Sequence, residues 1–353
     1  MNKTNPKLFV VIPNLNGRRN LGEKDFSKTI NSILNQSQPC NLIIVDNGST
    51  DKSEEFIRKN FPNVFIIRNE KNRGFAGGVN DGINFAISKG ADAVALFNSD
   101  AIADKDWLKY LWICMRGKND IGITTGKFLK QLPKNTIDST GDLYSIWGAA
   151  YPRGRSMKDK GQFDDKKHEY VLGGTGGASL YSTAMLKEIG LFDERFFAYY
   201  EDVDISLRAQ LQGWKCVYSS KSVAYHGLSK TSATMPGFIN YHALKNIVFL
   251  YTKNMPASLY WKNLWRFILV LGITYYKTLR ARLFIPALKA FGATILLLPF
   301  ILLDRVRLQH KKTVTAKYIN SILIQALPPG NSKLLEKFVK RFHLGKPYED
   351  ISI

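Results

Sequence analysis

The first hundred residues alternate between short apolar runs and longer stretches with helical spacing. The apolar runs are typical of strands that are buried on both faces. We predict strands at 8–15, 42–48, 64–69 and 93–100, and helices at 25–36, 51–60, 75–89 and 104–115. Ser49, Thr50 or Asp51 is the expected N-cap of the second of these helices. Strands separated by helices indicate an α/β fold, with a parallel sheet covered on both faces.

The middle of the chain has a less regular pattern. Between residues 121 and 181 neither period dominates, and Gly, Asp and Lys cluster at 147–167, which is typical of a surface loop. A short helix is expected before Gly190. A longer one is expected at 202–212, followed by one or two strands at 215–225.

The C-terminal part is predicted to be helical, with two apolar stretches at 264–276 and 285–303. The second stretch contains Pro286, Lys289 and Pro299, and a spanning helix needs about 20 mostly apolar residues, so its length is marginal. Its basic flanks favour a helix that lies in a membrane interface. A buried helix pair and a true membrane span are the alternatives.

Charge is concentrated in the same part of the chain. The net charge is +21, and residues 256–353 hold 16 Lys and Arg against 4 Asp and Glu. Basic residues mixed with apolar helices favour an anionic membrane surface over nucleic acid, which would need an aromatic and basic groove. Three distant cysteines without a CxxC motif argue against a disulfide framework or a zinc site, and they fit a reducing cytoplasm.

Small polar residues and glycine follow each predicted strand. Open parallel sheets bind ligands at the carboxyl ends of their strands, so we expect these residues to meet at one edge and to suit a sugar nucleotide. Glycines at 72–80 would let the backbone approach a diphosphate at a helix N-terminus, although a plain turn explains them as well. The residues are Pro13, Asn14, Asn16, Asp46, Asn47, Asn72, Gly74, Asn98, Ser99 and Asp100.

Three of the polar side chains suggest specific chemistry. Asp46 can accept the imino hydrogen of uracil or thymine, or it can belong to a simple Asp-Asn-Gly turn. Asp100 can hold the Mg²⁺ or Mn²⁺ that neutralises a diphosphate leaving group, or it can cap a helix. His226, as a neutral imidazole, can complete that metal shell or be structural.

The segment 196–204, FFAYYEDVD, places three acids at a predicted helix start. Glu201 and Asp202 are candidate general bases, because aromatic neighbours would raise their pKa. The alternative is that these acids only stabilise the helix N-terminus. Asp204 and Arg208 stand four residues apart and are expected to pair along the helix.

The order of these motifs resembles that of the inverting family 2 glycosyltransferases, in particular the bacterial rhamnosyltransferase-like branch. VIPNLNG, IIVDNGSTD, NRGFAGGVN, LFNSD, GGTGGASLY, FFAYYEDVD, VAYHGLSKTS and NIVFLYTKNMP follow one another over residues 8–256. The resemblance implies a GT-A fold with a mixed, Rossmann-like sheet. It also implies a glycosyltransferase domain at 1–250, with a nucleotide-binding half at 1–120 and an acceptor-binding half at 121–250. Residues 251–353 would form a basic amphipathic helical region.

The resemblance also implies roles for individual residues. Asp202 would be the catalytic base with Glu201 beside it, and Asp100 would bind a divalent metal, joined by His226. Asn98 stands where many relatives carry Asp, and Leu15 replaces a frequent aromatic residue. The nucleotide sugar would be bordered by Pro13, Asn14, Asn16, Asp46, Asn72, Gly74 and Phe75.

The implied reaction is a single displacement with inversion. A hexose such as rhamnose would pass from a dTDP- or UDP-sugar to a saccharide acceptor in cell-surface polysaccharide synthesis. The basic, apolar C-terminal region suggests an acceptor carried on a polyprenyl diphosphate, and a cytoplasmic enzyme attached peripherally to the inner face of the cell membrane. The rivals are a sugar nucleotidyltransferase, for which NLNGRRN is a poor signature, and a catalytically inactive membrane-tethered relative, which should have lost Asp100 or Asp202.

Overall fold

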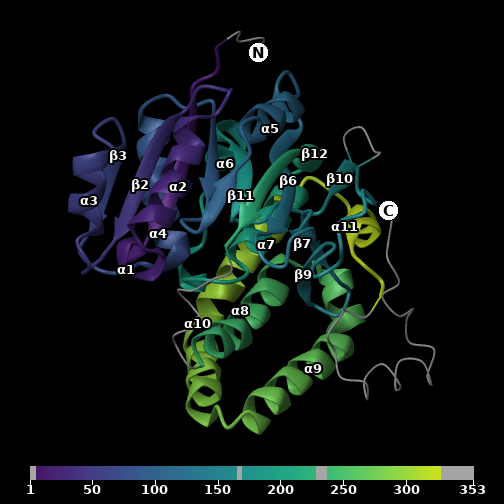
Figure 1. The fold of residues 1–353 in the computed structure, drawn as a ribbon. Coiled ribbons are helices and arrows are strands. Elements are labelled where there is room, and N and C mark those ends of the chain that lie inside the picture. Colours follow the sequence, from purple (N-terminus) through teal and green to yellow (C-terminus); the bar gives the residue numbers. More distant parts are fainter. Residues whose placement is uncertain (1–4, 165–168, 228–236, 327–353) are drawn as a thin grey trace.

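The computed structural model describes residues 5–164, 169–227 and 237–326. The end of the motif VAYHGLSKTS, from residue 228 on, and the last part of the basic region, 327–353, lie outside the described residues. Within the described ranges, ten strands form one mixed sheet in the order β10-β12-β6-β11-β4-β1-β2-β3, with β5 and β7 pairing at its side (Figure 1).

The N-terminal half of the sheet follows the prediction closely. Its parallel strands are β1 (Leu8–Asn14), β2 (Asn41–Asn47), β3 (Phe65–Asn69) and β4 (Ala93–Phe97). The predicted run at 93–100 is interrupted after Phe97, and β5 (Ala101–Ala103) pairs instead with a distant strand. The four predicted strands are therefore confirmed, the last of them in a shorter form.

Helices cover both faces of this half. Successive residues of a strand point to opposite faces, so Val10 packs with α2 (Glu23–Leu34) and Val11 packs with α4 (Gly74–Ser88). A Cβ on Gly82 of α4 would lie 2.4 Å from Val11 Cγ1, so this close helix–strand contact requires glycine. The other helices of this half are α1 (Gly17–Leu21), α3 (Ser53–Asn60) and α5 (Trp107–Met115).

The predicted cap of α3 is wrong. Its N-cap is Lys52, in a left-handed conformation and without a side-chain capping bond. Asp51 instead accepts the backbone N–H of Ser53 at 3.0 Å, inside the turn. Asp51, one residue before the N-cap, thus accepts a backbone N–H of the first helical turn, as a capping side chain would.

Antiparallel strands extend the sheet in the second half. β11 (Ala178–Ser182) is antiparallel to both β4 and β6 (Ile121–Lys130), and β12 (Lys215–His226) is parallel to β6. The shorter strands are β7 (Thr136–Ser139), β8 (Asp142–Tyr144), β9 (Ala150–Pro152) and β10 (Glu169–Val171). The sheet is thus mixed, as the resemblance implied.

The expected surface loop at 147–167 is only partly one. Trp147 is fully buried, and Arg153 is 1% exposed and pairs with Glu169 at 2.7 Å. The Arg153 guanidinium also lies against the rings of Phe163 and Tyr218. A buried cation with these partners makes the segment part of the core despite its polar composition.

Three of the helices that follow, α8 (Phe238–Asn254), α9 (Ala257–Arg280) and α10 (Phe284–Lys311), lie below the sheet in Figure 1. α8 packs against both α7 and α10, and one apolar cluster joins Tyr144, Leu207, Phe249 and Ile301. The predicted domain boundary at residue 250 therefore falls inside α8. The other elements are α6 (Thr183–Ile189), a 3₁₀ turn η1 (Glu194–Phe196), α7 (Glu201–Leu211) and α11 (Ala316–Ile322).

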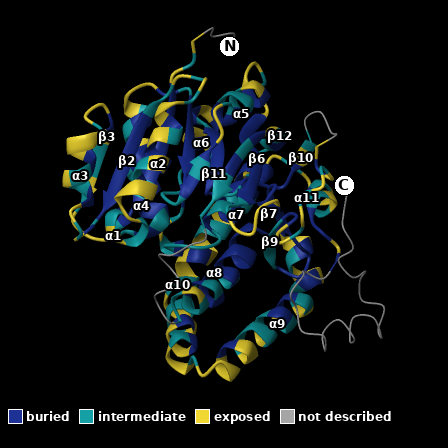
Figure 2. Cartoon of the chain, in the orientation of Figure 1, coloured by how far each residue is buried: buried dark blue, intermediate teal, exposed yellow. Residues whose placement is uncertain are grey.

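Helix α10 is the one helix in the described part of the chain that is long and apolar enough to cross a membrane. Only 17% of its most apolar window is buried, and Leu288 and Leu296 are 72% and 74% exposed. Trp261 on α9 is 71% exposed, and Figure 2 shows exposed residues along both helices. A buried helix pair is therefore not what the structure contains, because many apolar side chains of α9 and α10 face outward.

Candidate active site

A cavity of about 420 Å³ lies at the carboxyl ends of the parallel strands. Residues from β1, β2 and the turn after β4 line it together with residues from α7 and β12. Twelve of the fourteen predicted site residues line it: Pro13, Asn14, Asn47, Asn72, Gly74, Phe75, Asn98, Ser99, Asp100, Glu201, Asp202 and His226.

Asp46 and Asn16 are the two predicted residues that do not line the cavity. Asp46 is fully buried, its carboxylate accepts the Ser49 N–H at 2.9 Å, and it pairs with Arg68 at 3.2 Å. Asn16 has a φ of 55° and accepts the Thr50 N–H at 2.8 Å. Both side chains therefore stabilise the turn that lies behind the cavity wall. For Asp46 this corresponds to the second role considered from the sequence, a place in the Asp-Asn-Gly turn.

The neighbouring Asn47 reaches the cavity instead. Its amide donates to Asn72 Oδ1 at 3.1 Å and to the Gly74 carbonyl at 2.8 Å. Gly74 begins α4 with a φ of 72°, and a Cβ there would lie 2.3 Å from the Phe197 carbonyl oxygen. The glycine therefore lets the N-terminus of α4 lie close to the Phe197 loop at the cavity wall, where the Gly74 N–H donates to Asn72 Oδ1 at 2.8 Å and the Ala76 N–H donates to the Phe197 carbonyl at 3.2 Å.

His226 is held between two carboxylates. Its Nδ1 lies 2.8 Å from Asp138 Oδ2, its Nε2 lies 3.3 Å from Asp100 Oδ1, and the ring stacks on Phe128. Burial lowers the pKa of His226, but hydrogen bonds to Asp100 and Asp138 outweigh it and raise the pKa to about 9. Asn98 Nδ2 is also 3.1 Å from Nε2.

The raised pKa keeps His226 protonated near pH 7, so the neutral imidazole expected from the sequence is not the favoured form of the metal-free chain. Asp100 and His226 would offer one oxygen and one nitrogen to a divalent cation only once Nε2 has lost its proton. Metal-bound histidines usually donate their other ring N–H to a carboxylate, as Asp138 would accept it here, and that contact turns Nε2 toward Asp100. No group of three or more His, Cys, Asp or Glu side chains suited to a metal occurs among the described residues. Two protein ligands fit Mg²⁺ or Mn²⁺ only when substrate phosphates or water supply the rest.

Asp202 lies in the first turn of α7 at the cavity wall. Its carboxylate oxygens accept backbone N–H groups, one from Gly176 at 3.0 Å and the other from Val203 at 2.9 Å. Burial raises the pKa of Asp202, although the two backbone bonds act in the opposite direction. The side chain is thus fixed in position while its affinity for a proton is increased.

Two more acids surround Asp202. Glu201 is buried, and its Oε2 has no hydrogen-bond partner in the described chain. Asp142 on β8 is also buried, with Oδ2 unpartnered among the described residues. Burial first, and the charge of Asp202 second, raise the pKa of both Glu201 and Asp142 well above the usual range. No motif or pattern in the sequence pointed to Asp142.

The loop before Asp202 is strained. Phe197, Tyr199 and Tyr200 have φ values of 66°, 70° and 71°, a left-handed conformation that residues other than glycine rarely adopt. The buried Asn246 amide holds this loop, donating to the carbonyls of Phe196, Ala198 and Tyr199 at 2.9, 2.9 and 2.7 Å. Its motif, NIVFLYTKNMP, belongs to the resemblance but suggested no role.

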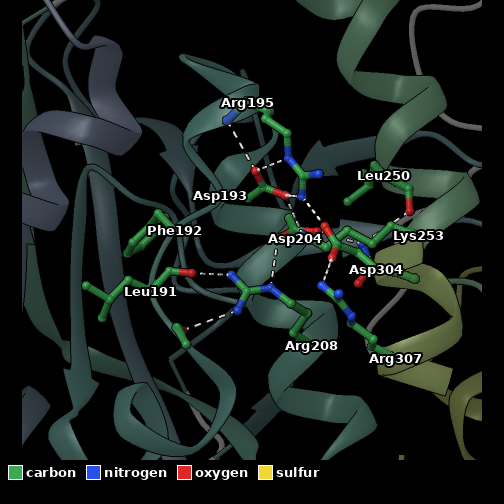
Figure 3. A network of polar contacts seen from close by, with 12 residues as sticks. Leu191, Phe192, Asp193, Arg195, Asp204, Arg208, Leu250, Lys253, Asp304 and Arg307 are labelled. Carbon is green, nitrogen blue, oxygen red and sulfur yellow. Dashed lines mark hydrogen bonds and ion pairs between the residues drawn. The ribbon is translucent and has the colours of Figure 1, made fainter. Parts of the chain in front are cut away.

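A buried ionic network anchors α7 from below (Figure 3). Asp204 is fully buried and pairs with Arg208 at 2.8 Å, as predicted, and with Lys253 of α8 at 3.0 Å. Lys253 also pairs with Asp193 at 2.7 Å, and Arg195 pairs with Asp304 of α10. The helix that carries Asp202 is thus connected to both α8 and α10.

Sequence reasoning also missed Arg155 and the wall segment Thr175–Gly177. Arg155 lines the cavity, and its guanidinium lies 3.7 Å from Asp138, so it adds positive charge near the Asp100–His226 pair. A Cβ on Gly176 would lie 3.2 Å from the Phe75 ring, which keeps this segment close to the opposite wall. Arg155 stands in the segment expected to be a surface loop, and Thr175–Gly177 belongs to GGTGGASLY, a motif of the resemblance to which no role was given.

Proteins with known activities share this sequence pattern. N-acetylglucosaminyl-diphospho-decaprenol L-rhamnosyltransferase of Mycobacterium tuberculosis is 25% identical over 235 residues, covering 62% of this chain and 76% of that protein. Glucomannan 4-beta-mannosyltransferase 7 of Arabidopsis thaliana is 25% identical over 231 residues, covering 60% of this chain and 38% of that protein.

Solved structures show the GT-A fold. A structure of GalNAc-T7 with UDP, GalNAc and Mn²⁺ superposes with a TM-score of 0.55 at 16% identity. It covers 71% of this chain, which in turn spans 48% of that protein. S. aureus TarS 1-349 in complex with UDP-GlcNAc gives a TM-score of 0.51 at 18% identity, covering 77% and 73%.

The family model confirms the resemblance. It is described as glycosyl transferase family 2 and matches residues 9–190, just over half of the 353 residues. That range holds the strand-end residues of the cavity and ends shortly before the acidic helix. The chain belongs to glycosyl transferase family 2 and is a glycosyltransferase with a GT-A fold.

Proposed function

We propose that the protein transfers a sugar, with inversion, from a pyrimidine nucleoside-diphosphate sugar to a saccharide carried on a polyprenyl diphosphate. One observation supports this most strongly. A cavity with the Asp100–His226 pair in its wall also holds Asp202, a backbone-fixed carboxylate with a raised pKa. A nucleotide-sugar transferase needs both parts in one place.

Asp202 acts as the general base in this proposal. It takes the proton from the acceptor hydroxyl while that oxygen bonds to the anomeric carbon, and the bond from that carbon to the diphosphate oxygen breaks. The N–H groups of Gly176 and Val203 keep the carboxylate oriented. A pKa nearer neutrality makes the carboxylate a stronger base, and such catalysis contributes about 10²–10⁴-fold.

Asp100 and His226 would hold a divalent cation. When bound, the cation would neutralise the charge that develops on the departing diphosphate. Arg155 and the N-terminus of α4 line the same cavity and add positive potential toward that group. The Mn²⁺ in the GalNAc-T7 structure supports this assignment.

The donor and acceptor follow from the relatives. Because Asp46 is engaged in the turn, we place the base against Pro13, Asn14 and Asn47 in the wall. UDP occupies the GalNAc-T7 structure, and the M. tuberculosis relative transfers L-rhamnose to an N-acetylglucosaminyl-diphospho lipid. We therefore propose a dTDP- or UDP-sugar such as dTDP-rhamnose, and an acceptor of that class in cell-surface polysaccharide synthesis.

The exposed face of α9 and α10 would attach the enzyme peripherally to the cytoplasmic face of the cell membrane. Its apolar residues would lie at the level of the lipid headgroups, with the flanking cations on anionic phosphates. This places the catalytic domain, residues 1–250 as predicted from the sequence, above a bilayer that contains the acceptor.

Transfer assays test the proposal. Purified protein is incubated with Mn²⁺, a donor panel and N-acetylglucosaminyl-diphospho-polyprenol, and the product is identified by mass spectrometry and NMR of its anomeric configuration. Asp202→Asn should lower kcat by about 10²–10⁴-fold and leave donor affinity within about twofold. Asp120→Asn, a surface acid paired with Lys215, is the matched control.

Two results would contradict the proposal. Near-normal transfer by Asp202→Asn would remove the base from the mechanism. Release of inorganic diphosphate from a nucleoside triphosphate and a sugar phosphate, without glycosyl transfer, would favour the nucleotidyltransferase alternative.

A further inference from the structure

A second cavity, of about 1050 Å³, lies beside the catalytic one. It is bounded by η1, the N-terminal end of α8 and the turn between α9 and α10. Phe197 and Phe238 line both cavities, and their rings are in edge contact with centroids 6.2 Å apart. The two spaces are therefore neighbours on either side of one aromatic wall.

The charged groups of this cavity are unequally neutralised. Glu194 pairs with Arg73, and Arg195 pairs with Asp193 and Asp304. Lys245 donates to the Arg195 carbonyl at 2.5 Å, and the nearby His242 is neutral near pH 7 because burial, with help from Lys245, lowers its pKa to about 4.

Apart from the buried Lys245, which donates to a carbonyl, two exposed cations of the cavity have no acidic partner in the described part of the chain. Among residues 5–164, 169–227 and 237–326, no acid pairs with Arg282 or Lys289. Both side chains are exposed, one in the α9–α10 turn and the other in the second turn of α10. They leave positive charge at the mouth of the cavity.

The backbone at Arg282 supports a role for its side chain. Its φ is 60°, a left-handed conformation that glycine adopts without strain. Across the cavity, Gly237 packs so tightly on Pro286 that a Cβ would lie 2.3 Å from Pro286 Cγ. The turn is thus held in place against α8, with a long cation where glycine would fit the backbone better.

The other walls are apolar. Tyr241, Leu283, Phe284 and Ile285 line the cavity, and Phe284 and Ile285 are 60% and 68% exposed at its outer edge. Leu288, further along α10, is 72% exposed, so apolar side chains that could contact an isoprenoid chain extend beyond the cavity on this helix.

We propose that this cavity binds the diphosphate and first isoprene units of a polyprenyl-diphosphate acceptor. Arg282 and Lys289 contact the phosphates, the apolar walls contact the chain, and the sugar extends past Phe197 toward Asp202. The inference rests on the proposed function for the identity of the acceptor. The shared wall with the catalytic cavity favours this occupant over a bulk phospholipid headgroup, which would need no path to the catalytic base.

Binding of farnesyl diphosphate, measured by calorimetry, tests the site without catalysis. The cavity variant is Arg282→Gly with Lys289→Gln, and the control is Arg280→Gln with Lys262→Gln, which removes the same charge from exposed positions of α9 outside the cavity. The cavity variant should bind at least tenfold more weakly, and the control should stay within twofold of the wild type. Because glycine relieves the φ at position 282, Tm should not fall.

Several outcomes would overturn the inference. One is that the cavity variant and the wild type bind farnesyl diphosphate with equal affinity. Binding of farnesyl diphosphate in the donor site alone would give this same result. An equal loss in the control would indicate general charge attraction. Inorganic diphosphate that binds as tightly as farnesyl diphosphate would exclude recognition of the chain, and anionic phosphatidylglycerol vesicles that displace the probe would favour a phospholipid headgroup.

A kinetic comparison separates this inference from the proposed function. The cavity variant should raise KM for N-acetylglucosaminyl-diphospho-polyprenol at least tenfold more than KM for octyl N-acetylglucosaminide. If the wild type transfers to neither acceptor, the proposed function fails and the calorimetric result still decides the site. If it transfers to both and the variant changes the two KM values equally, the cavity assignment fails.

Discussion

Asn246 offers a direct test of how the catalytic loop is held. Its single amide group donates to three carbonyls of the loop that precedes Asp202, and the side chain is fully buried. The isosteric change Asn246→Leu removes these donors without opening a large cavity. The carbonyls of Phe196, Ala198 and Tyr199 would then lose the partner that holds the strained conformation.

The expected size of the effect follows from the contacts. Leaving buried polar groups unsatisfied costs about 1–3 kcal/mol. Each of the three residues with a positive φ has a backbone conformation that costs about 1–2 kcal/mol. A loop without the amide donors would therefore lower its free energy by rearranging. A shift of about 1.4–2.8 kcal/mol toward relaxed loop conformations lowers the competent population, and with it kcat, about tenfold to hundredfold.

Asn263→Leu is the matched control. Asn263 is 2% exposed on α9, where it donates to the Leu259 carbonyl at 3.0 Å, away from the cavity. Both variants should lose stability in denaturant titrations, and only Asn246→Leu should lose kcat when both are assayed well below their Tm. If the two variants retain equal kcat, the amide does not position the catalytic loop.

Three further predictions concern pH, metal and membrane. Because burial raises the pKa of Asp202 and the base must be ionised, kcat should fall on acidification at a higher pH than an ordinary aspartate would give; a flat kcat–pH profile down to about pH 4 would refute this. Asp138→Asn should raise the Mn²⁺ concentration for half-maximal activity about 10–100-fold, and an unchanged Mn²⁺ titration, as expected for the control Asp159→Asn, would contradict the metal assignment. Replacing the exposed Leu288 and Leu296 by Ser should weaken flotation with anionic vesicles at least about tenfold, because each buried Leu contributes about 1.5–3 kcal/mol; equal flotation would place the membrane contact elsewhere.

The sequence predicted the sheet edge well for a physical reason. Parallel strands buried on both faces need continuous apolar runs, so β1 to β4 stand out from their surroundings. Their carboxyl ends meet at one edge whatever the strand order, and polar residues there must share a cavity. Asn14 and Asp100 were found in this way although 86 positions separate them along the chain.

The sequence could not decide which of two neighbouring polar residues faces the cavity. Asp46 and Asn47 end the same strand, and consecutive side chains point to opposite sides. In the structure the Asp46 carboxylate accepts the Ser49 N–H within the turn and pairs with Arg68 of the neighbouring strand, and it does not line the cavity. Asp138 and Asn246 were missed for a similar reason, because their partners lie 88 and 50 residues away.

The C-terminal helices belong to the catalytic machinery as well as to the predicted membrane surface. Asn246 and Lys253 of α8 hold the loop and helix that carry Asp202, and Asp304 of α10 extends the same network. Arg305 of α10 donates to the Thr252 carbonyl at 2.5 Å and so fastens α10 to α8. Removing everything after residue 255 would therefore disturb the active site together with the membrane contact. For this reason the two roles can be separated only by substitutions on the exposed face of α10, where side chains contact neither α8 nor the cavity.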